Sequence, residues 1–190
     1  HQSLDAYVNQ ILNNEMEMQE TTFNPDDSIW PRIIPTDPEI NMRLIKKPGT
    51  VRNTITRTFN GVAGHAGLFS TARDLAILAT MYLNDGDING KNIFTKSTID
   101  NFSKKQSKNS TRALGWDTGN GNQENIIANL FSDDAFGHTG FTGTSIWIDP
   151  TIDLYIILLT NRTYEMTNRS LIKEFRPLIH DYIIECIIKN

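Results

Sequence analysis

Two runs with a period of two, near the C-terminus, constrain the fold of this 190-residue chain more than any other feature. They are TSIWIDP, which ends at Pro150, and DLYIILLTN, which begins at Asp153. Both are rich in β-branched and aromatic residues, and only a short turn separates them. The sequence therefore predicts an antiparallel β-hairpin.

Helical spacing of apolar residues surrounds this hairpin and predicts four helices, over residues 3–15, 70–86, 95–106 and 168–188. Pro177 predicts a kink or break near Arg176 in the last of them. The stretch from Met16 to Asn60 is rich in proline and loses the period, which indicates a long irregular connection. Residues 107–135 are predicted to be loops with at most one short strand. Helices beside an antiparallel sheet give the α+β class.

Composition narrows the class of protein. With 38% apolar and 21% charged residues, the chain is compatible with one globular domain. A net charge of -4 without a basic face argues against a nucleic-acid partner. No run approaches about 18 apolar residues and no leader is visible, so we expect no membrane span or signal peptide, and the compartment is undetermined. The single cysteine, Cys186, excludes an intrachain disulfide and is expected to pack in the core.

The loop GVAGHAG, residues 61–67, precedes a helix as a phosphate loop would. It lacks the Gly-Lys-Ser/Thr ending that holds phosphate and metal, which argues against nucleotide binding. Residues 85–96 begin like a calcium loop, but Lys96 stands where a bidentate Glu is needed. The histidines His1, His65, His138 and His180 have no metal-ligand spacing. We therefore expect no cofactor and no metal.

A resemblance to a known family rests on four blocks in order: GVAGHAGLFSTARDLA, LGWD, FGHTGFTGTSIWIDP and LLTNR. Together they resemble the C-terminal half of the serine β-lactamase and penicillin-binding-protein-like family, near class C enzymes and their esterase and peptidase relatives. The resemblance implies the C-terminal part of a β-lactamase/transpeptidase-like fold, with the last three strands of its antiparallel sheet packed with helices. Residues 1–190 would be one partial domain, organised as 1–60, 61–135 and 136–190.

The resemblance also implies a site. His138, Thr139 and Gly140 occupy the place of the family's Lys-Thr-Gly wall, and the backbone N–H of Phe141 would form half of an oxyanion hole. Gly140 and Gly143 would let the strand edge approach a substrate closely. His138 could donate a hydrogen bond or shuttle a proton. The alternative is a turn between two strands with a buried histidine.

Two further positions are implied by the same resemblance. The loop around His65 and Ala66 would border the active site and touch substrate; the alternative is a tight turn that only seats the following helix. Asn161, directly after the last strand, would lie near a substrate carboxylate.

The family's Ser-x-x-Lys nucleophile motif has one match, Ser170–Lys173, which lies after the hairpin and is of the kind expected by chance. Tyr82-Leu83-Asn84 matches Tyr-x-Asn, but we expect it to pack and cap a helix. No Gly-x-Ser-x-Gly elbow is present. We expect acyl transfer from an ester, β-lactam or D-amino-acid peptide in the complete fold, and no activity of the chain alone. The alternative is a non-catalytic binding remnant.

The expected partners follow from the same resemblance. They are a small-molecule acyl substrate in the complete fold, and either an N-terminal segment or a second copy at an exposed sheet edge. The strand LYIILLTN is expected to offer that edge, because the resemblance places it at the centre of a larger sheet.

Overall fold

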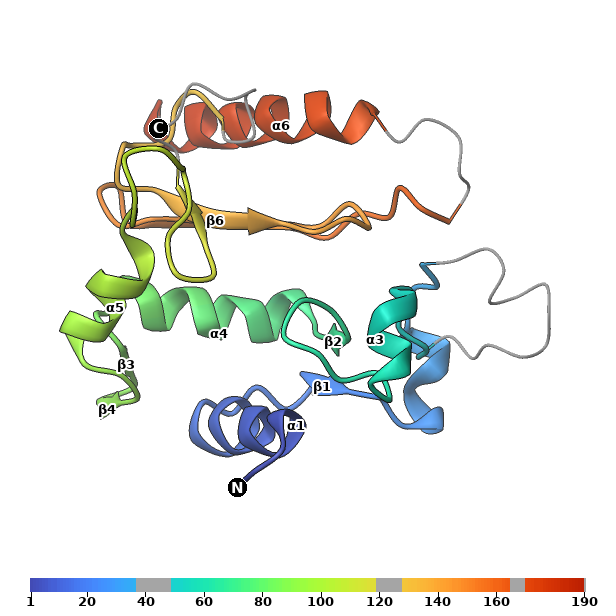
Figure 1. The fold of residues 1–190 in the computed structure, drawn as a ribbon. Coiled ribbons are helices and arrows are strands. Elements are labelled where there is room, and N and C mark those ends of the chain that lie inside the picture. The colour runs from blue at the N-terminus through green and yellow to red at the C-terminus, as the bar shows by residue number, and fades with distance from the viewer. Residues whose placement is uncertain (37–48, 119–127, 165–169, 190) are drawn as a thin grey trace. The chain divides into compact units, whose positions relative to one another are not determined.

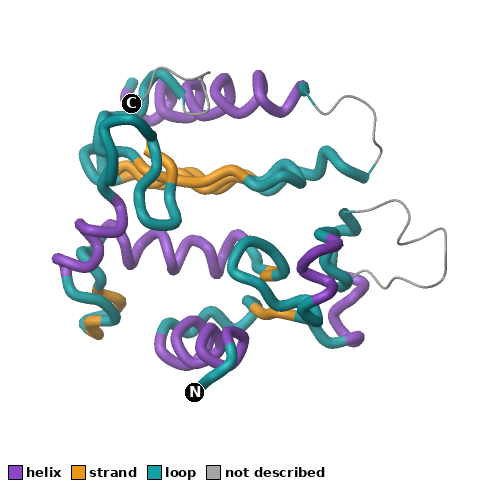
Figure 2. The backbone as a smooth tube through the Cα atoms, viewed as in Figure 1, coloured by secondary structure: helices purple, strands orange, loops and turns teal. Residues whose placement is uncertain are grey.

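The computed structural model describes residues 1–36, 49–118, 128–164 and 170–189 (Figure 1). These residues form two compact units. Unit 1 comprises His1–Leu78 and Asn161–Met166, and unit 2 comprises Ala79–Thr160 and Thr167–Asn190. Both units mix helices with short antiparallel strands, which confirms the α+β class (Figure 2).

Unit 1 begins with the predicted helical segment, which changes its winding partway. Helix α1 spans Leu4–Val8 and continues as a π-helix over Asn9–Glu15. The expected irregular connection contains the short strand β1 (Thr22–Phe23), a 3-10 helix (Asp27–Arg32) and helix α3 (Thr54–Thr58). Strand β1 pairs antiparallel with β2 (Leu68–Phe69). These short elements have no periodic signal of their own, so the sequence did not predict them.

A buried carboxylate joins two distant segments of unit 1. Asp74, in the first turn of helix α4 (Ala72–Leu83), is 3% exposed. Its Oδ2 accepts hydrogen bonds from the backbone N–H of Glu20 at 2.8 Å and from the hydroxyl of Thr21 at 2.7 Å. The Thr21 hydroxyl is also 2.8 Å from that of Ser70. Because a buried carboxylate needs such donors, this network fixes the segment before β1 to the start of α4.

Helix α4 starts and ends slightly inside the predicted 70–86. At its start, the side chain of Thr71 accepts a hydrogen bond from the N–H of Asp74 at 3.3 Å. Past its end, Asp85 and Gly86 have positive φ angles of 54° and 99°, and the N–H of Gly86 bonds to the carbonyl of Met81 at 2.8 Å. The predicted glycine stop is confirmed, with the left-handed turn starting one residue earlier.

Unit 2 is built around a four-stranded antiparallel sheet in the order β5-β6-β7-β8. The strands are β5 (Asp117–Thr118), β6 (Phe136–Thr139), β7 (Ser145–Asp149) and β8 (Leu154–Leu158). Strands β7 and β8 form the predicted hairpin, with Trp147 opposite Ile156. Strand β5 is the one short strand allowed for residues 107–135, of which 119–127 lie outside the described residues.

The remaining elements of unit 2 are a small hairpin and two helices. Strands β3 (Asp87–Ile88) and β4 (Lys91–Asn92) pair with each other. Helix α5 spans Lys96–Ser103, and Thr95 caps it by accepting a hydrogen bond from the N–H of Thr98. It lies within the predicted 95–106.

The two faces of the sheet pack differently. On one face, Phe136 and Ile148 form a buried cluster with Ala79 of α4, and Tyr82 packs against it. On the other face, Trp147 is 1% exposed and its ring lies 6.1 Å from that of Phe131. The alternation that predicted the hairpin therefore places side chains in two separate buried layers.

The last helix, α6 (Leu171–Ile188), corrects two expectations. It is one uninterrupted helix through Pro177, so of the predicted kink or break near Arg176 the break is wrong (Figure 1). Cys186 is exposed rather than packed in the core, because the face of α6 that is buried carries Ile172, Arg176, His180 and Ile184.

Candidate active site

The turn between β6 and β7 carries the residues predicted to form a substrate wall. Two backbone hydrogen bonds close it, from the N–H of Gly140 to the carbonyl of Thr144 at 2.7 Å and from the N–H of Gly143 to the carbonyl of Gly140 at 3.2 Å. The hydroxyl of Thr160, just after β8, donates to the carbonyl of Gly143 at 2.7 Å. The turn is therefore held from inside and from the neighbouring strand.

The glycines of this turn have local reasons to be glycine. A Cβ on Gly140 would lie 2.1 Å from the side-chain oxygen of Thr144, and Gly143 has a φ of +122°. Both features come from the turn itself, whatever a substrate requires. Phe141, at the tip, is 58% exposed.

His138 lies at the end of β6 with both ring nitrogens engaged. Nε2 is 3.0 Å from Nη1 of Arg112, and Nδ1 is 3.0 Å from the carbonyl oxygen of Thr139. A guanidinium can only donate, so Nε2 accepts and the ring hydrogen lies on Nδ1, which donates to Thr139. Because His138 is exposed, the alternative of a buried histidine is wrong.

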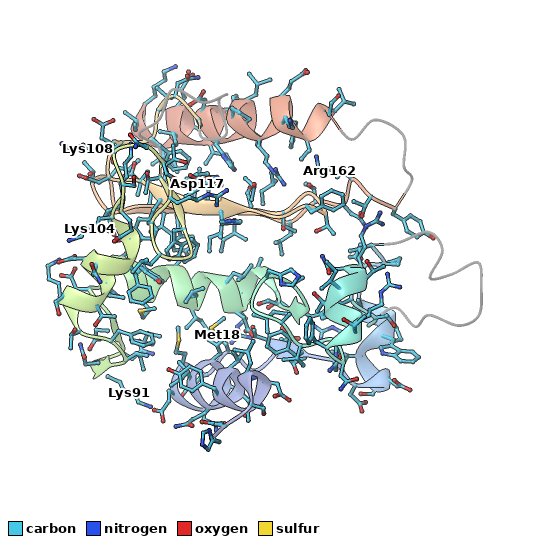
Figure 3. The ribbon with its side chains drawn as sticks, in the orientation of Figure 1. Met18, Lys91, Lys104, Lys108, Asp117 and Arg162 are labelled. Carbon is cyan, nitrogen blue, oxygen red and sulfur yellow. The ribbon has the colours of Figure 1, made fainter. Side chains whose placement is uncertain are left out.

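A carboxylate lies next to Arg112. Asp117 of β5, labelled in Figure 3, has a nearly buried side chain. Its Oδ2 is 3.5 Å from Nη2 of Arg112. The order Asp117, Arg112, His138 thus joins a carboxylate, a guanidinium and an imidazole across strands β5 and β6. The sequence reasoning missed Arg112, because nothing in its local pattern indicates a partner 26 residues away.

Arg176 of α6 reaches the same turn. Its Nη2 donates to the carbonyl oxygens of Gly140 at 2.8 Å and of Thr144 at 2.7 Å, and the residue is 6% exposed. This contact was also missed. The sequence does contain one indication of an inward-facing Arg176. Arg176 and His180 are four residues apart, which puts two polar residues on one face of a helix rich in isoleucine.

The loop GVAGHAG belongs to unit 1. His65 is exposed, and its Nε2 is 3.2 Å from the hydroxyl of Thr56, a fully buried residue of α3. Ala66 is half-buried and bridges to Ala63. Gly67 has a φ of +112°, and a Cβ there would lie 2.2 Å from the carbonyl of Gly61. The loop is a tight turn fixed to α3, and contact with a substrate stays a prediction.

Asn161 also belongs to unit 1, where its amide joins two segments. Its Nδ2 donates to the carbonyl of Pro35 at 2.7 Å, and its Oδ1 accepts from the N–H of Thr163 at 3.0 Å. The hydroxyl of Thr163 in turn donates to the carbonyl of Thr36 at 2.6 Å. These bonds give Asn161 a structural task, and its predicted role near a substrate carboxylate is an expectation beyond them.

Two other motifs are explained by packing and charge. Tyr82 stacks edge-on against Trp116 at 5.4 Å and accepts its indole N–H at 3.0 Å, which confirms the packing role. Burial raises the pKa of the Tyr82 hydroxyl, with the bond from Trp116 opposing this. In the calcium-like loop, Nζ of Lys96 lies 2.6 Å from Oδ1 of Asp85. The ammonium group therefore already pairs with a carboxylate that a calcium ion would need as a ligand.

Within the described ranges, no group of three or more His, Cys, Asp or Glu side chains is placed to hold a metal ion. Among the helices described, none is both long enough and apolar enough to span a bilayer.

Comparison with known proteins identifies the family. A family model described as Beta-lactamase matches residues 1–179. A Bacillus subtilis (strain 168) protein named N-acetylmuramyl-L-alanine amidase is 35% identical over 175 residues, which cover 85% of this chain and 40% of the relative. A Salmonella typhi protein provisionally named D-alanyl-D-alanine carboxypeptidase is 33% identical, with the same coverage. The chain thus spans about two fifths of the length of these relatives.

Solved structures agree on the fold. A β-lactamase from Mycobacterium bovis has a TM-score of 0.63 at 18% identity, covering 95% of this chain and 55% of that one. A penicillin-binding protein homologue from Caulobacter crescentus has a TM-score of 0.57 at 16% identity, covering 84% and 47%. These similarities confirm the β-lactamase/transpeptidase-like fold. Since the family model also matches nearly the whole sequence, the chain belongs to the beta-lactamase family.

Proposed function

We propose that this chain supplies one wall and half of the oxyanion hole of an acyl-transfer site, and that a serine from another segment attacks the substrate. The observation that carries the proposal is the turn after β6, whose closing bonds hold the Gly140–Phe141 peptide in place. In the proposed reaction the serine oxygen bonds to the carbonyl carbon, the carbonyl oxygen becomes negative, and the N–H of Phe141 donates to it. The bond to the leaving group then breaks, and the amine departs with the proton that the serine hydroxyl gave up. Water next adds its hydroxyl to the acyl carbon and its proton to the serine oxygen, which releases a carboxylic acid and restores the serine.

The proposed substrate class is an amide next to alanine. The names of the Bacillus subtilis and Salmonella typhi relatives both describe cleavage of such a bond. Both names favour an alanine amide over the esters and β-lactams of the expected range, and the name of the Salmonella typhi relative alone specifies a D-amino-acid peptide. Thr139 and Gly140 would line the substrate, and the guanidinium of Arg112 gives this wall a positive charge through His138.

The nucleophile is proposed to come from a segment that corresponds to the remaining length of the relatives. Within this sequence, Ser170–Lys173 is the one Ser-x-x-Lys match. Ser170 is exposed at the start of α6, and the carbonyl of the same residue accepts from the N–H of Lys173. A helix start after the hairpin is not the position that the family's motif occupies, so we assign no nucleophilic role to Ser170.

Active-site titration tests whether the nucleophile comes from another segment. The chain alone, and the chain co-expressed with a family segment carrying Ser-x-x-Lys and Tyr-x-Asn, are labelled with a fluorescent penicillin and a fluorophosphonate. We expect labelling only in the co-expressed pair, and none when the serine of that segment is replaced by alanine. In the pair, His138→Ala should lower turnover roughly tenfold to a thousandfold. Stoichiometric labelling of the lone chain would show a nucleophile within residues 1–190, and no labelling of a folded pair would favour a binding remnant.

The same segment is the proposed partner at the edge of the sheet. Strand β8 ends the order β5-β6-β7-β8, so among the described strands it pairs with β7 alone. An apolar edge strand invites a further strand. We propose that the segment carrying the nucleophile adds that strand, and that a second copy of the chain takes its place when the segment is absent. Sedimentation of the chain with and without the segment separates these cases: a lone chain that stays monomeric at high concentration contradicts the proposal.

A further inference from the structure

The buried arginine of α6 makes an unusual contact for a charged side chain. Arg176 is 6% exposed, and one nitrogen, Nη2, donates to two carbonyl oxygens, those of Gly140 and Thr144. An Nη nitrogen carries two hydrogens, so it can satisfy both carbonyls at once. Burial of a guanidinium is costly unless such bonds are made. The inward position of Arg176 is therefore tied to this turn.

The two carbonyls are the two ends of the turn. Each also accepts a backbone bond within it, Gly140 from the N–H of Gly143 and Thr144 from the N–H of Gly140. Arg176 thus holds the points where the chain leaves β6 and enters β7, and Phe141 lies between them. The hydroxyl of Thr160 holds a third point, the carbonyl of Gly143.

The carbonyl of Gly140 and the N–H of Phe141 belong to one peptide group. The described peptide bonds are all trans, and in a trans peptide C=O and N–H point in opposite directions. Because the Gly140 oxygen points to Arg176, the Phe141 N–H points away from the guanidinium. A cation bonded to the oxygen also polarises the peptide group, which makes its N–H a stronger donor.

We propose that Arg176 is the positioning residue for the oxyanion donor, setting both the direction and the donor strength of the Phe141 N–H. This inference rests on the proposed function for the role of Phe141, whereas the effect on the peptide group does not depend on it. The alternative is that Arg176 only fastens α6 to the sheet. In that case any change that loosens the turn should have the same effect.

The test compares three variants. Arg176→Met removes the cation and keeps an apolar stem, Arg176→Lys keeps the charge, and Thr160→Val is the matched control because it removes a bond to the same turn at a different carbonyl. The first readout is the amide ¹⁵N and ¹H shift of Phe141 in the chain itself. We expect a large upfield change in Arg176→Met, a partial one in Arg176→Lys, and little change in Thr160→Val.

The second readout is turnover of the co-expressed pair. Arg176→Met should lower kcat roughly tenfold to a hundredfold, part of what loss of a whole oxyanion donor costs, with KM changed less than about threefold. Arg176→Lys should recover part of that loss. If Arg176→Met does not fold, Arg176→Lys carries both readouts and should show an intermediate effect in each.

The outcomes separate this inference from the proposed function. Equal shift changes in Arg176→Met and Thr160→Val, or no change in either, would overturn it whether or not the pair is active. A selective shift change with unaltered kcat would remove Phe141 from the oxyanion hole and thereby contradict both. A selective shift change in a pair that is never labelled would leave Arg176 orienting the peptide and refute the proposed function alone.

Discussion

Acid should destabilise unit 2 through His180. This residue of α6 is fully buried, and neither ring nitrogen has a hydrogen-bond partner among the described residues. Phe131 packs edge-on against the ring at 5.9 Å. The pKa of His180 is lowered from 6.5 to about 4: burial is the largest cause, the nearby charge of Arg176 adds to it, and the charge of Asp181 opposes both. The folded protein therefore holds His180 neutral at a pH where the unfolded chain is protonated.

The direction and size of the stability change follow from the difference in proton binding between the folded and unfolded states. Below pH 6.5 the unfolded chain binds a proton at His180 that the folded chain does not, so the free energy of unfolding falls until the pH reaches about 4. Between pH 7 and pH 4.5 the loss is about 2 kcal/mol, from the ratio of the two protonation equilibria. Such a loss is a large part of the stability of a small domain.

Urea denaturation followed by tryptophan fluorescence measures this loss. The leucine of His180→Leu cannot be protonated, so the stability of this variant should fall by about 2 kcal/mol less than that of the parent between pH 7 and pH 4.5. Carboxylates contribute to both proteins alike and cancel in the comparison. His1→Gln, at an exposed histidine, is the control and should follow the parent. Parallel pH profiles for the parent and His180→Leu, or an NMR titration of His180 near pH 6.5, would refute the reasoning.

Three shorter predictions concern other residues. Asp74→Asn should lower the free energy of unfolding by about 2–4 kcal/mol, because the N–H of Glu20 and the buried hydroxyl of Thr21 lose their carboxylate acceptor. Asp153→Asn, at an exposed turn, should change it by less than about 0.5 kcal/mol, and similar values for the two variants would contradict this. Gly137→Ala should cost about 1–3 kcal/mol and alter the fluorescence of Trp147, because the new Cβ would lie 2.5 Å from that ring; an unperturbed spectrum would contradict it. Ser170→Ala should leave serine labelling of the co-expressed pair unchanged, and a large loss with folding intact would make Ser170 the nucleophile.

The sequence predicted best those elements that have a long periodic run or specific capping residues. Both strands of the β7–β8 hairpin carry β-branched and aromatic residues, and only an antiparallel pair fits so short a turn. Helix α4 has a hydroxyl residue before it and Gly86 after it. Strands of two residues, such as β1 and β2, contain too few side chains for any period, so pairing within the folded unit alone defines them.

The site was predicted less completely, because its contacts are between residues far apart in the sequence. The order His-Thr-Gly located the turn correctly, but the partners of that turn, Arg112 and Arg176, lie 26 and 36 residues away from the residues they contact. No local pattern encodes such a distance. A charged residue on the apolar face of a helix is the signal that remains, and it marks Arg176 but not Arg112.

Helix α6 buries two polar residues and leaves apolar residues exposed. Its buried face carries Arg176 and His180, while an apolar stripe lies exposed on the outside, formed by Leu171, Phe175, Leu178 and Tyr182. Apolar burial alone does not explain why these two polar residues face inward. The two carbonyls of the β6–β7 turn give Arg176 a reason to face inward, so the contact with the proposed oxyanion loop also decides which apolar residues are left outside. We expect a partner to cover a contiguous apolar stripe of this kind. The segment proposed to pair with β8 would therefore protect this stripe too if it covers both surfaces, and hydrogen exchange of α6 in the co-expressed pair would detect it.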